Sequence, residues 1–525
     1  MTRAGEERFD YVVIGAGSAG CAVAARLAES GEHSVLVLEA GPRDRSVWIH
    51  VPVGFFKILS NPRYNWGYEA EFDESTDARK VAWPRGRVIG GSSSTNGLVY
   101  VRGQPEDFDE WQAASATGWG WSGVRPYFEK AEAGPVGVSD PRYTHPLCDA
   151  LIEAAERRGI ARIPDFNGPT QAGVGYYRLN TRHGRRCSAA VGYLHPASRQ
   201  PNVVVRSECM VERLDIRDGH LLGVWYRHSG QRHFASVSRE AILSAGAIGS
   251  PQLLQLSGIG PAEVLERAGV AVTLDHPAVG RNLQDHFASR IMARVAHSRT
   301  LNEMSRSWLS QLGMGLTYAA RQRGPLTLGA VMAGLFTSVT EGTARPDLQL
   351  LFGPLSSDNP AKGLHDFPGM TLTVCPLRPK SRGWLAIRSA DPNDHPRIVA
   401  NYLEDPADRR ILIEGLRFAR ALLDTAPLNR FVADEYLPGK DCTSDEQLLR
   451  FARARGGSIY HPCGTCTMGD DPHAVVDSAL RVRGIGGLRV ADASIMPSIP
   501  SGNINAACMM IGEKAADLIR TGRQS

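Results

Sequence analysis

Apolar and polar positions at the start of the chain follow the order of a βαβ unit. The apolar run at 11–14 predicts a strand, the alanine-rich stretch at 19–30 predicts a helix, and the run at 34–39 predicts a second strand. Three further apolar runs predict later crossings of the same sheet, at 202–206, 222–226 and 240–244. This part of the chain therefore predicts a Rossmann-like α/β unit.

The pattern changes between 297 and 456. A helix is predicted at 308–321, and apolar positions then alternate with polar ones in three runs, at 348–352, 370–374 and 384–388. Alternation with period two predicts an antiparallel sheet with one face exposed to solvent. An amphipathic helix is expected at 408–425, with five apolar residues roughly on one side: Ile411, Leu412, Leu416, Ala419 and Leu422.

The last segment returns to glycine-rich loops and ends in a predicted helix at 511–520. We therefore predict two interleaved domains. Residues 1–296 with 457–525 form one, discontinuous and with some insertions of the other, and residues 297–456 form the second. The uncharged stretch at 325–340 is shorter than the roughly 18 to 20 apolar residues of a spanning helix, so it predicts core or pocket wall.

Composition narrows the class of protein. Of the 525 residues, 42% are hydrophobic and 22% are charged, which is typical of a globular protein with a large buried core. The formal net charge of +4 is small and the arginines are scattered, so nothing indicates nucleic acid or an acidic membrane surface as a partner. A small molecule is the expected partner, and oligomer formation stays open.

The cysteines and the N-terminal segment predict a compartment. Nine cysteines, an odd number, are spread between Cys21 and Cys508 without the dense spacing of a disulfide-rich secreted module. The segment from Met1 to Asp10 is polar and leads into an apolar strand without a hydrophobic leader. We expect a cytoplasmic protein with no transmembrane segment.

Gly15, Gly17 and Gly20 have the spacing G-x-G-x-x-G between the first predicted strand and helix, and Glu39 ends the second strand. The first glycine permits a tight turn, the second lets backbone N–H groups approach a pyrophosphate, and the third permits close helix packing. The Glu39 carboxylate can accept ribose hydroxyls and disfavours a 2′-phosphate. The glycines alone could be an incidental turn, but together with the strands, helix and acid they predict a dinucleotide site.

Residues 83–96 are rich in glycine, serine and arginine, which disfavours regular structure and suits a loop pressed against a ligand. Backbone donors, hydroxyls and the Asn96 amide could hold an extended second half of a cofactor. This favours a flavin over a transiently bound nicotinamide. The alternative is an ordinary surface loop.

Several separated motifs resemble the glucose–methanol–choline (GMC) oxidoreductase family in order and spacing, over nearly the whole chain. They lie at 15–20, 85–96, 245–251, 279–286, 378–383, 460–465 and 492–494. The bacterial choline-dehydrogenase-like and aliphatic alcohol dehydrogenase branch is the most similar. The resemblance implies a Rossmann-like FAD-binding domain, an interleaved substrate domain with an antiparallel sheet, and an active site between them.

The resemblance also implies the cofactor contacts. It places the pyrophosphate at Gly15, Gly17, Ser18 and Gly20, the adenosine ribose at Glu39 and the adenine near Val211. The flavin side would be lined by Gly91, Ser92, Asn96, Gly97, Leu98, Val99, Asp492, Ala493, Asn503 and Ile504. Further expected contacts are Ala19, Ala40, Arg87, Ala245, Gly246 and Tyr460.

Oxidising an alcohol with a flavin sends a hydride to the ring and needs a base for the hydroxyl proton. Histidine suits this role because its ordinary pKa, near 6.5, is easily tuned. The family resemblance implies that His461 is the base and that Asn503 hydrogen-bonds the developing alkoxide. Taken alone, His461 could be an ordinary core histidine and Asn503 a turn residue, with Asn505 as its rival.

Other candidate groups are given structural roles. Cys463 and Cys466 form a CxxC, but no second pair stands at metal-ligand spacing, so we expect no metal and interpret both as packing beside the flavin. His286 and Asp285 are interpreted as residues that hold backbone.

Departures from the family pattern refine the prediction. Thr95 stands where some relatives attach FAD through a histidine, so we expect non-covalent FAD. Met332 stands where choline-handling relatives carry a glutamate, which favours a neutral alcohol. The predicted reaction is oxidation of a primary alcohol to an aldehyde, with O₂ or a quinone as acceptor. The alternatives are a lyase that keeps FAD as a structural element and an inactive FAD-binding protein.

Overall fold

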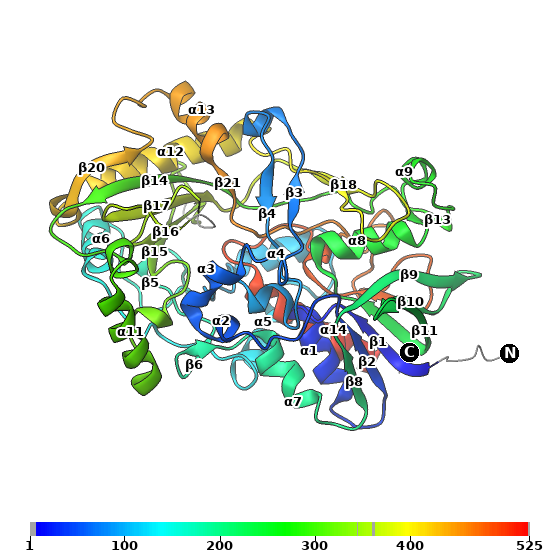
Figure 1. Cartoon of the computed structure of the whole chain (residues 1–525). Helices are drawn as coiled ribbons and strands as arrows, with labels where there is room; N and C mark the ends of the chain where they lie inside the picture. Colours follow the sequence, from blue (N-terminus) through cyan, green and yellow to red (C-terminus); the bar gives the residue numbers. More distant parts are fainter. Residues whose placement is uncertain (1–6, 344, 360–362, 523–525) are drawn as a thin grey trace.

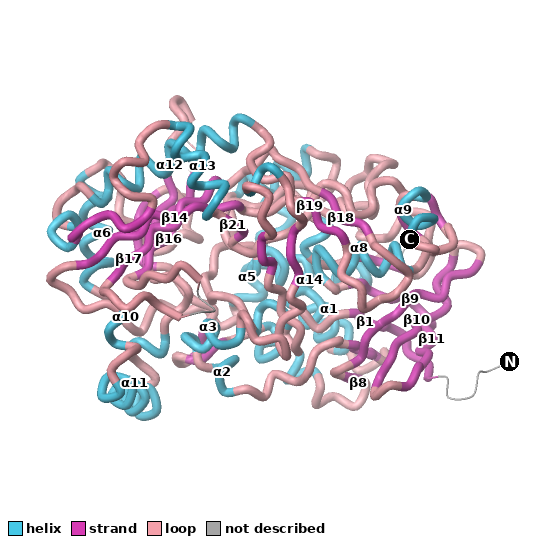
Figure 2. The backbone as a smooth tube through the Cα atoms, turned by 45° about the horizontal axis from the view of Figure 1, so that its top comes forward, coloured by secondary structure: helices cyan, strands magenta, loops and turns pink. Residues whose placement is uncertain are grey.

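The computed structural model describes residues 7–343, 345–359 and 363–522. Residues 1–6, part of the N-terminal segment considered above, lie outside the described residues. Two large sheets occupy opposite ends of the molecule, and helices pack around them (Figure 1). With the top turned forward, helices, short strands and long loops lie between the two groups of strands (Figure 2). The predicted α/β class with a second, antiparallel sheet is confirmed.

The first sheet is built around the predicted βαβ unit. Its strands are β8 (Val203–Arg206), β2 (Val35–Leu38), β1 (Glu7–Ile14), β11 (Gln231–Leu243), β10 (His220–His228) and β9 (Cys209–Arg217), with β22 (Leu488–Val490) paired to β11. β8, β2, β1, β11 and β22 pair in parallel. Helix α1 (Ser18–Ala28) packs against α14 (Asn505–Thr521), so the two ends of the chain build one layer.

The second sheet carries the middle of the chain. Its strands are β20 (Val432–Leu437), β14 (Phe287–Val295), β17 (Gly369–Pro376), β16 (Leu348–Gly353), β15 (Ala333–Thr337) and β5 (Gly173–Tyr176), with β21 (Gly457–Ser458) paired to β14. The pairs are antiparallel, as predicted. The predicted solvent-exposed face was wrong, because β16 is buried along its whole length and β17 nearly so. Helices α12 (Pro406–Leu423) and α6 (Pro146–Arg157) contact the sheet, and residues of β14, β16 and β17 line a cavity.

The remaining elements connect the two sheets. The other helices of eight or more residues are α4 (Pro105–Ala113), α5 (Trp121–Glu132), α8 (Gly246–Leu256), α11 (Trp308–Arg321) and α13 (Asp445–Arg455). Short pairs of strands are β3 (Tyr68–Ala70) with β4 (Val81–Trp83), β6 (Thr181–Arg182) with β7 (Arg185–Arg186), β12 (Ile259–Gly260) with β13 (Leu274–Asp275), and β18 (Trp384–Ala386) with β19 (Arg397–Val399). Short helical turns are α2 (Val47–His50), η1 (Pro52–Gly54), α3 (Phe55–Ile58), η2 (Glu74–Thr76), η3 (Gly91–Ser94), η4 (Ala190–Leu194), α7 (His195–Ala197), α9 (Ala262–Arg267), α10 (Leu301–Met304), η5 (Pro325–Thr327), η7 (Leu428–Phe431) and η8 (Ala493–Ile495). The run at 384–388 therefore belongs to a separate ribbon rather than to the second sheet.

The chain passes repeatedly between the two halves. β5 and β14 both precede residue 297, yet both belong to the second sheet, while β22 and α14 return to the first. One large apolar core surrounds the first sheet and another lies between the second sheet and its helices. This arrangement places a surface of each half against the other, and the domain boundaries given above stay a prediction.

Candidate active site

A cavity of about 410 Å³ lies between the two halves. One wall comes from the ends of β1 and β2 and from the glycine-rich loops, through residues such as Ile14, Leu38 and Gly91. The opposite wall comes from strands of the second sheet, through residues such as Met292, Leu351 and Thr373. The cavity is therefore a site assembled from segments far apart in the sequence.

The turn after β1 is shaped to receive a phosphate. Gly15 has φ +98°, and a Cβ there would lie 2.5 Å from the Ser244 carbonyl oxygen, so only glycine fits. Gly17 precedes α1 without a side-chain cap, which leaves the first N–H groups of the helix free beside the cavity. Such an N-terminus attracts an anionic group.

Glu39 lies at the end of β2, beside this turn. Its carboxylate accepts the Ala16 N–H at 3.0 Å and the Gly41 N–H at 2.8 Å. Burial raises the pKa of Glu39 to about 7, although these two hydrogen bonds act to lower it. The side chain is therefore fixed at the cavity wall, where it can accept further hydroxyl donors.

Most predicted cofactor residues line the cavity together. They are Gly15, Gly17, Ser18, Ala19, Glu39, Ala40, Gly91, Ser92, Asn96, Gly97, Leu98, Val99, Val211, Ala245, Gly246, Tyr460, Asp492, Ala493, Asn503 and Ile504. Gly20 and Arg87 are not in the lining. A Cβ on Gly20 would lie 2.0 Å from the Gly15 carbonyl oxygen, so Gly20 permits helix packing, while the Arg87 guanidinium lies over the Trp66 ring at 5.0 Å.

The loop that follows β4 is pressed against the α1 turn. Gly91 has φ +51°, and a Cβ there would lie 2.7 Å from Gly17 Cα. Arg186, which sequence reasoning missed, fixes the loop by donating to Asn96 Oδ1 at 2.7 Å and to the Asn96 carbonyl at 2.8 Å. Burial lowers the pKa of Arg186 to about 9. No motif marks this arginine, because its partners are side-chain and backbone oxygens distant in the sequence.

The two predicted catalytic residues meet in the cavity. Asn503 Nδ2 lies 3.1 Å from His461 Nε2, and both residues line the cavity wall. Asn505, the rival candidate, also lines the cavity, but it accepts from the Ser18 hydroxyl at 2.7 Å and donates to Asn180 at 3.0 Å. The geometry therefore pairs His461 with Asn503.

A chain of hydrogen bonds assigns the proton positions on His461. His286 Nε2 lies 2.8 Å from the Leu377 carbonyl, which can only accept, so His286 Nε2 carries the hydrogen. In neutral His286 the other nitrogen, Nδ1, then accepts from His461 Nδ1 at 2.9 Å. His461 therefore carries its hydrogen on Nδ1, and its Nε2 lone pair points toward Asn503. His286, interpreted above as a backbone holder, also sets the tautomer of its neighbour.

Electrostatics keep this ring neutral. Burial, the neighbouring His286 and then Arg85 hold the pKa of His461 well below its usual value of 6.5. Burial lowers the pKa of His286 to about 4. The His461 backbone N–H donates to Asp285 at 2.7 Å, and Tyr402 donates to the other oxygen of that carboxylate. His461 is thus a fixed, neutral hydrogen-bond acceptor at neutral pH.

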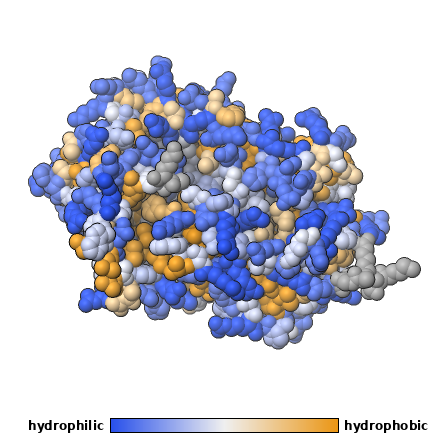
Figure 3. Space-filling model, viewed as in Figure 1, coloured by the Kyte–Doolittle hydropathy of each residue, from blue (hydrophilic) through white to orange (hydrophobic). Residues whose placement is uncertain are grey.

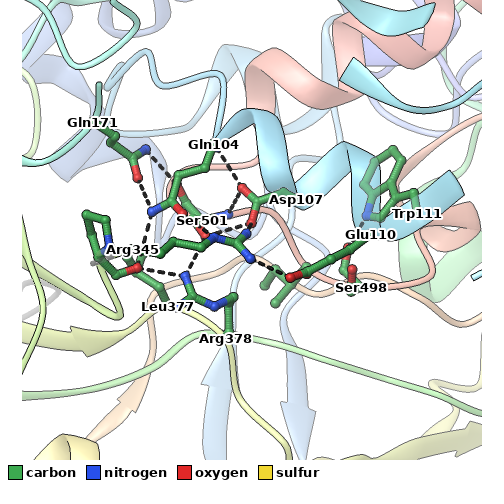
Figure 4. A network of polar contacts seen from close by, with 12 residues as sticks. Gln104, Asp107, Glu110, Trp111, Gln171, Arg345, Leu377, Arg378, Ser498 and Ser501 are labelled. Atoms are coloured by element: carbon green, nitrogen blue, oxygen red, sulfur yellow. Dashed lines mark hydrogen bonds and ion pairs between the residues drawn. The ribbon is translucent and has the colours of Figure 1, made fainter. Parts of the chain in front are cut away.

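A buried polar network holds the segment that carries Asn503 (Figure 4). Asp107 accepts from the Ser501 N–H and from the Ser501 hydroxyl, both at 2.7 Å, and is paired with Arg345. Gln171 donates to the Ser501 carbonyl at 2.8 Å. Gln349 Nε2 lies 3.4 Å from Asn503 Oδ1, which orients the amide so that Nδ2 faces His461. These contacts hold Ser501 and the Asn503 side-chain oxygen and so fix the position of the Asn503 amide.

Sequence reasoning missed the wall that faces the flavin side. It includes Phe55, Phe56, Trp66, Arg290, Met292, Val331, Leu351, Leu355, Thr371 and Thr373. Alternation predicted the strands that carry Leu351, Thr371 and Thr373 but does not tell which face meets a ligand. Val331 lies in the stretch 325–340, which was predicted as core or pocket wall. Met332 does not line the cavity: it is buried against Cys148, and its neighbour Val331 forms the wall.

Cys463 and Cys466 are fully buried in the core of the first sheet, and burial raises the pKa of both thiols. Thr95, at 4% exposure, lines the cavity beside Asn96.

The residues present fit a flavin dinucleotide. The cavity offers an uncapped helix N-terminus for a pyrophosphate and a carboxylate for a ribose, and Gly91, Ala493 and the His461–Asn503 pair line the part left for a ring system. A dinucleotide-binding fold with a buried histidine and asparagine in such a cavity is typical of a flavin-dependent oxidoreductase.

Comparison with known proteins agrees with this class. Two GMC oxidoreductase family models match the chain, over residues 9–288 and 379–512. An alcohol dehydrogenase (acceptor) of Pseudomonas putida is 38% identical over 97% of this chain and 95% of its own. The mitochondrial choline dehydrogenase of Homo sapiens is 41% identical over 98% of this chain and 90% of its own.

Solved structures give the same result. Pyridoxine 4-oxidase from Mesorbium loti has a TM-score of 0.87 at 30% identity, covering 98% of this chain and 99% of its own. A formate oxidase has a TM-score of 0.91 at 27% identity, covering 99% of both chains. The chain belongs to the GMC oxidoreductase family, and it is an FAD-dependent enzyme that acts on CH–OH groups. Among the described residues, no helix is both long and apolar enough to cross a membrane.

Proposed function

We propose that this enzyme oxidises a primary alcohol to an aldehyde, with His461 as the base and Asn503 as the group that holds the substrate oxygen. The observation that carries the proposal is the hydrogen-bond chain from Leu377 through His286, which leaves a lone pair on His461 Nε2. A general base must reach the proton that it removes. Asn503 Nδ2 lies 3.1 Å from His461 Nε2, so both groups can contact the same substrate hydroxyl.

The pair has complementary roles. The Nε2 lone pair accepts the hydroxyl proton, and the Asn503 amide donates to the oxygen as negative charge develops on it. The turn after β1 and Glu39 would hold FAD, which would supply the acceptor for the hydride of the alcohol carbon. Burial excludes water and makes both interactions stronger than they would be in solvent. Asp285 and His286 are positioning residues, since they hold the backbone and the ring of His461.

The cofactor is held without a covalent bond in this proposal, because Thr95 offers no imidazole for attachment. Acid precipitation of the yellow protein should leave the flavin in the supernatant, whereas a covalent link would keep it in the pellet. O₂ or a quinone serves as the electron acceptor, and the cytoplasm is the proposed location.

Anaerobic mixing with a panel of primary alcohols tests the reaction. We expect at least one alcohol to bleach the flavin absorbance and His461→Gln to abolish the fast phase while retaining FAD. If no alcohol bleaches the flavin of the holoenzyme, the lyase or the inactive binding protein replaces this proposal. Readmission of air then separates an oxidase, which recolours at once, from a dehydrogenase.

A further inference from the structure

One cation in the cavity wall has no partner within the protein. Arg290 is half-buried on β14 and lines the cavity, and the described part of the chain gives its guanidinium no ion pair and no hydrogen bond. Two other shielded arginines have carboxylate partners, Glu240 for Arg489 and Asp107 for Arg345, and Arg87 lies over the Trp66 ring. A half-buried guanidinium without an acceptor is costly unless a ligand supplies one.

A hydroxyl lies beside this arginine. Thr373 on β17 is directly opposite Arg290 in the antiparallel register and also lines the cavity. Directly opposed residues of a sheet have their Cβ atoms about 5 Å apart, so both groups can contact one ligand. The neighbouring wall is apolar and includes Met292, Leu351 and Val331. Arg290 and Thr373 therefore form a small polar site within a largely apolar part of the wall.

This polar site lies away from the catalytic pair. His286, whose ring contacts His461, lies immediately before β14 and four residues before Arg290, which for extended chain is roughly 14 Å between the two Cα atoms. A substrate could thus place its hydroxyl at His461 and its far end at Arg290. A single arginine balances a single negative charge, which favours a carboxylate over a phosphate dianion.

We propose that Arg290 and Thr373 form a carboxylate subsite, so that the preferred substrates are primary alcohols with a carboxylate at the end remote from the hydroxyl. This inference rests on the proposed function and names its substrate class. It also disfavours a quaternary ammonium substrate, since two cations would meet at Arg290.

The test compares 4-(hydroxymethyl)benzoate with benzyl alcohol, two substrates that differ in the carboxylate alone. In Arg290→Met, we expect kcat/KM for the carboxylate alcohol to fall at least tenfold more than kcat/KM for benzyl alcohol. For Arg290→Lys, kcat/KM for the carboxylate alcohol should lie between the wild-type and Arg290→Met values. Lysine keeps the positive charge but lacks the planar guanidinium that binds a carboxylate through two hydrogen bonds. Arg294→Met is the matched control on the same strand, because Arg294 pairs with Asp434 outside the cavity.

Two results would overturn the subsite: equal losses for both substrates in Arg290→Met, or no preference of the wild-type enzyme for the carboxylate alcohol. Failure of the proposed function would look different, because then neither alcohol would reduce the flavin.

A second, independent feature is helix α11, whose apolar face is open to solvent. None of the fourteen residues of α11 is buried. Trp308, Leu309, Leu312 and Leu316 are 70%, 62%, 55% and 63% exposed. At 100° per residue these four fall within one arc of about 100°, and Tyr318 on another side holds the helix through its hydrogen bond to the Gly184 carbonyl. Hydrophobic surface gathers over this projecting helix and beside it (Figure 3).

Basic residues lie at both ends of this helix and on the neighbouring hairpin. Arg306, Arg321 and Arg323 flank the helix, and no Asp or Glu occurs between Glu303 and Glu341. The adjoining β6–β7 hairpin adds Arg182 and Arg185, both exposed. None of these five arginines forms an ion pair with a carboxylate of the described residues; Arg306 and Arg182 bind backbone carbonyls. The small net charge of the whole chain conceals this local concentration.

We infer that α11 docks on an anionic lipid surface, with its apolar face inserted at the level of the headgroups and the arginines against the lipid charges. An amphipathic helix with exposed Trp and Leu and a basic border has this binding mode. A symmetric pairing of two copies through α11 is disfavoured, because a twofold axis would bring the same arginines together.

Co-sedimentation of the purified holoenzyme with vesicles tests this surface. We expect binding to vesicles with 30% phosphatidylglycerol, weaker binding to pure phosphatidylcholine, and a decrease with salt. The triple variant Leu309→Gln, Leu312→Gln, Leu316→Gln should lose at least tenfold in vesicle partition while its alcohol turnover in solution is kept. Leu222→Gln with Val272→Gln, which are exposed positions elsewhere, is the control.

Absence of binding at low salt, or an equal loss in the control, would overturn the inference. A dimer in solution that the triple variant separates would also overturn it, in favour of a second copy of the chain.

Discussion

The two walls of the cavity are built in different ways. The wall on the first-sheet side includes tight backbone turns at Gly15 and Gly91 and an uncapped helix N-terminus. The wall on the second-sheet side consists of side chains that project from β14, β16 and β17, among them Arg290 and Leu351. His461 and Asn503 lie where the two walls meet.

The different construction of the two walls suits two different tasks, cofactor binding and substrate selection. The tight turns of the first wall tolerate little change, because a Cβ added at Gly15 or Gly91 would meet backbone atoms, and this suits a constant cofactor. A wall of strand side chains can be altered one residue at a time without moving the strands, and this suits a variable substrate. Changes to the first wall should therefore affect all substrates alike, whereas changes to the second should alter selectivity.

The largest effect is expected where the walls meet. His461→Gln removes the lone pair that accepts the proton, and kcat should fall about 1,000-fold, within the range for loss of a general base. Flavin content should stay at the wild-type level, as measured by absorbance. A loss of less than tenfold would assign the base to another group.

Gly91→Val tests the backbone wall. Its Cβ would lie 2.7 Å from Gly17 Cα at φ +51°, so FAD affinity should fall about 100-fold, as a strain of a few kcal/mol implies. Titration of the apoprotein with FAD measures the change. Gly134→Val is a control, because a Cβ at Gly134 meets no atom within 4 Å. Equal affinity in the two variants would contradict the contrast between the walls.

Asp107→Asn tests the support behind Asn503. Weakening the buried contact with Arg345 and Ser501 should lower kcat roughly tenfold through misplacement of Asn503, and should reduce the free energy of unfolding by about 2 kcal/mol. Glu110→Gln is the control, since Glu110 contacts the same arginine but is 53% exposed and should change stability by less than about 0.5 kcal/mol. Activity and chemical denaturation report the two effects.

The smallest effect is expected from Leu351→Ala in the side-chain wall. It should shift the ratio of kcat/KM between a bulky and a short alcohol by about tenfold with FAD affinity unchanged. Leu335→Ala removes the same side chain from the core behind the sheet and should lower stability without altering this ratio. If the kcat/KM ratio changed equally in Leu351→Ala and Leu335→Ala, the cavity wall would not control selectivity any more than the core does.

The same contrast explains what the sequence could predict. The tight turns at Gly15 and Gly91 need glycine and belong to motifs, and the family resemblance that these motifs carry led to residues of the first wall such as Glu39, whereas Met210 and Leu253 of the same wall were not predicted. Arg186 and Gln349 act through partners that only the fold brings near, and no local pattern marks them. On the second wall, alternation predicted strands at 348–352 and 370–374, but it could not show that both faces are covered, or that Val331 rather than Met332 meets the cavity.

The pH dependence of flavin reduction tests the central claim most directly. Because burial and His286 hold the pKa of His461 below 6.5, the ring is neutral above that pH and becomes protonated, and so unable to accept a proton, as the pH falls through its pKa. Stopped-flow reduction under anaerobic conditions should therefore give kred/Kd values that are constant from about pH 8 to below pH 6.5 and decline only as the pH falls through the lowered pKa of His461. His461→Gln should lack this decline. A wild-type profile independent of pH, or the same acid limb in the variant, would contradict the assignment of His461 as the base.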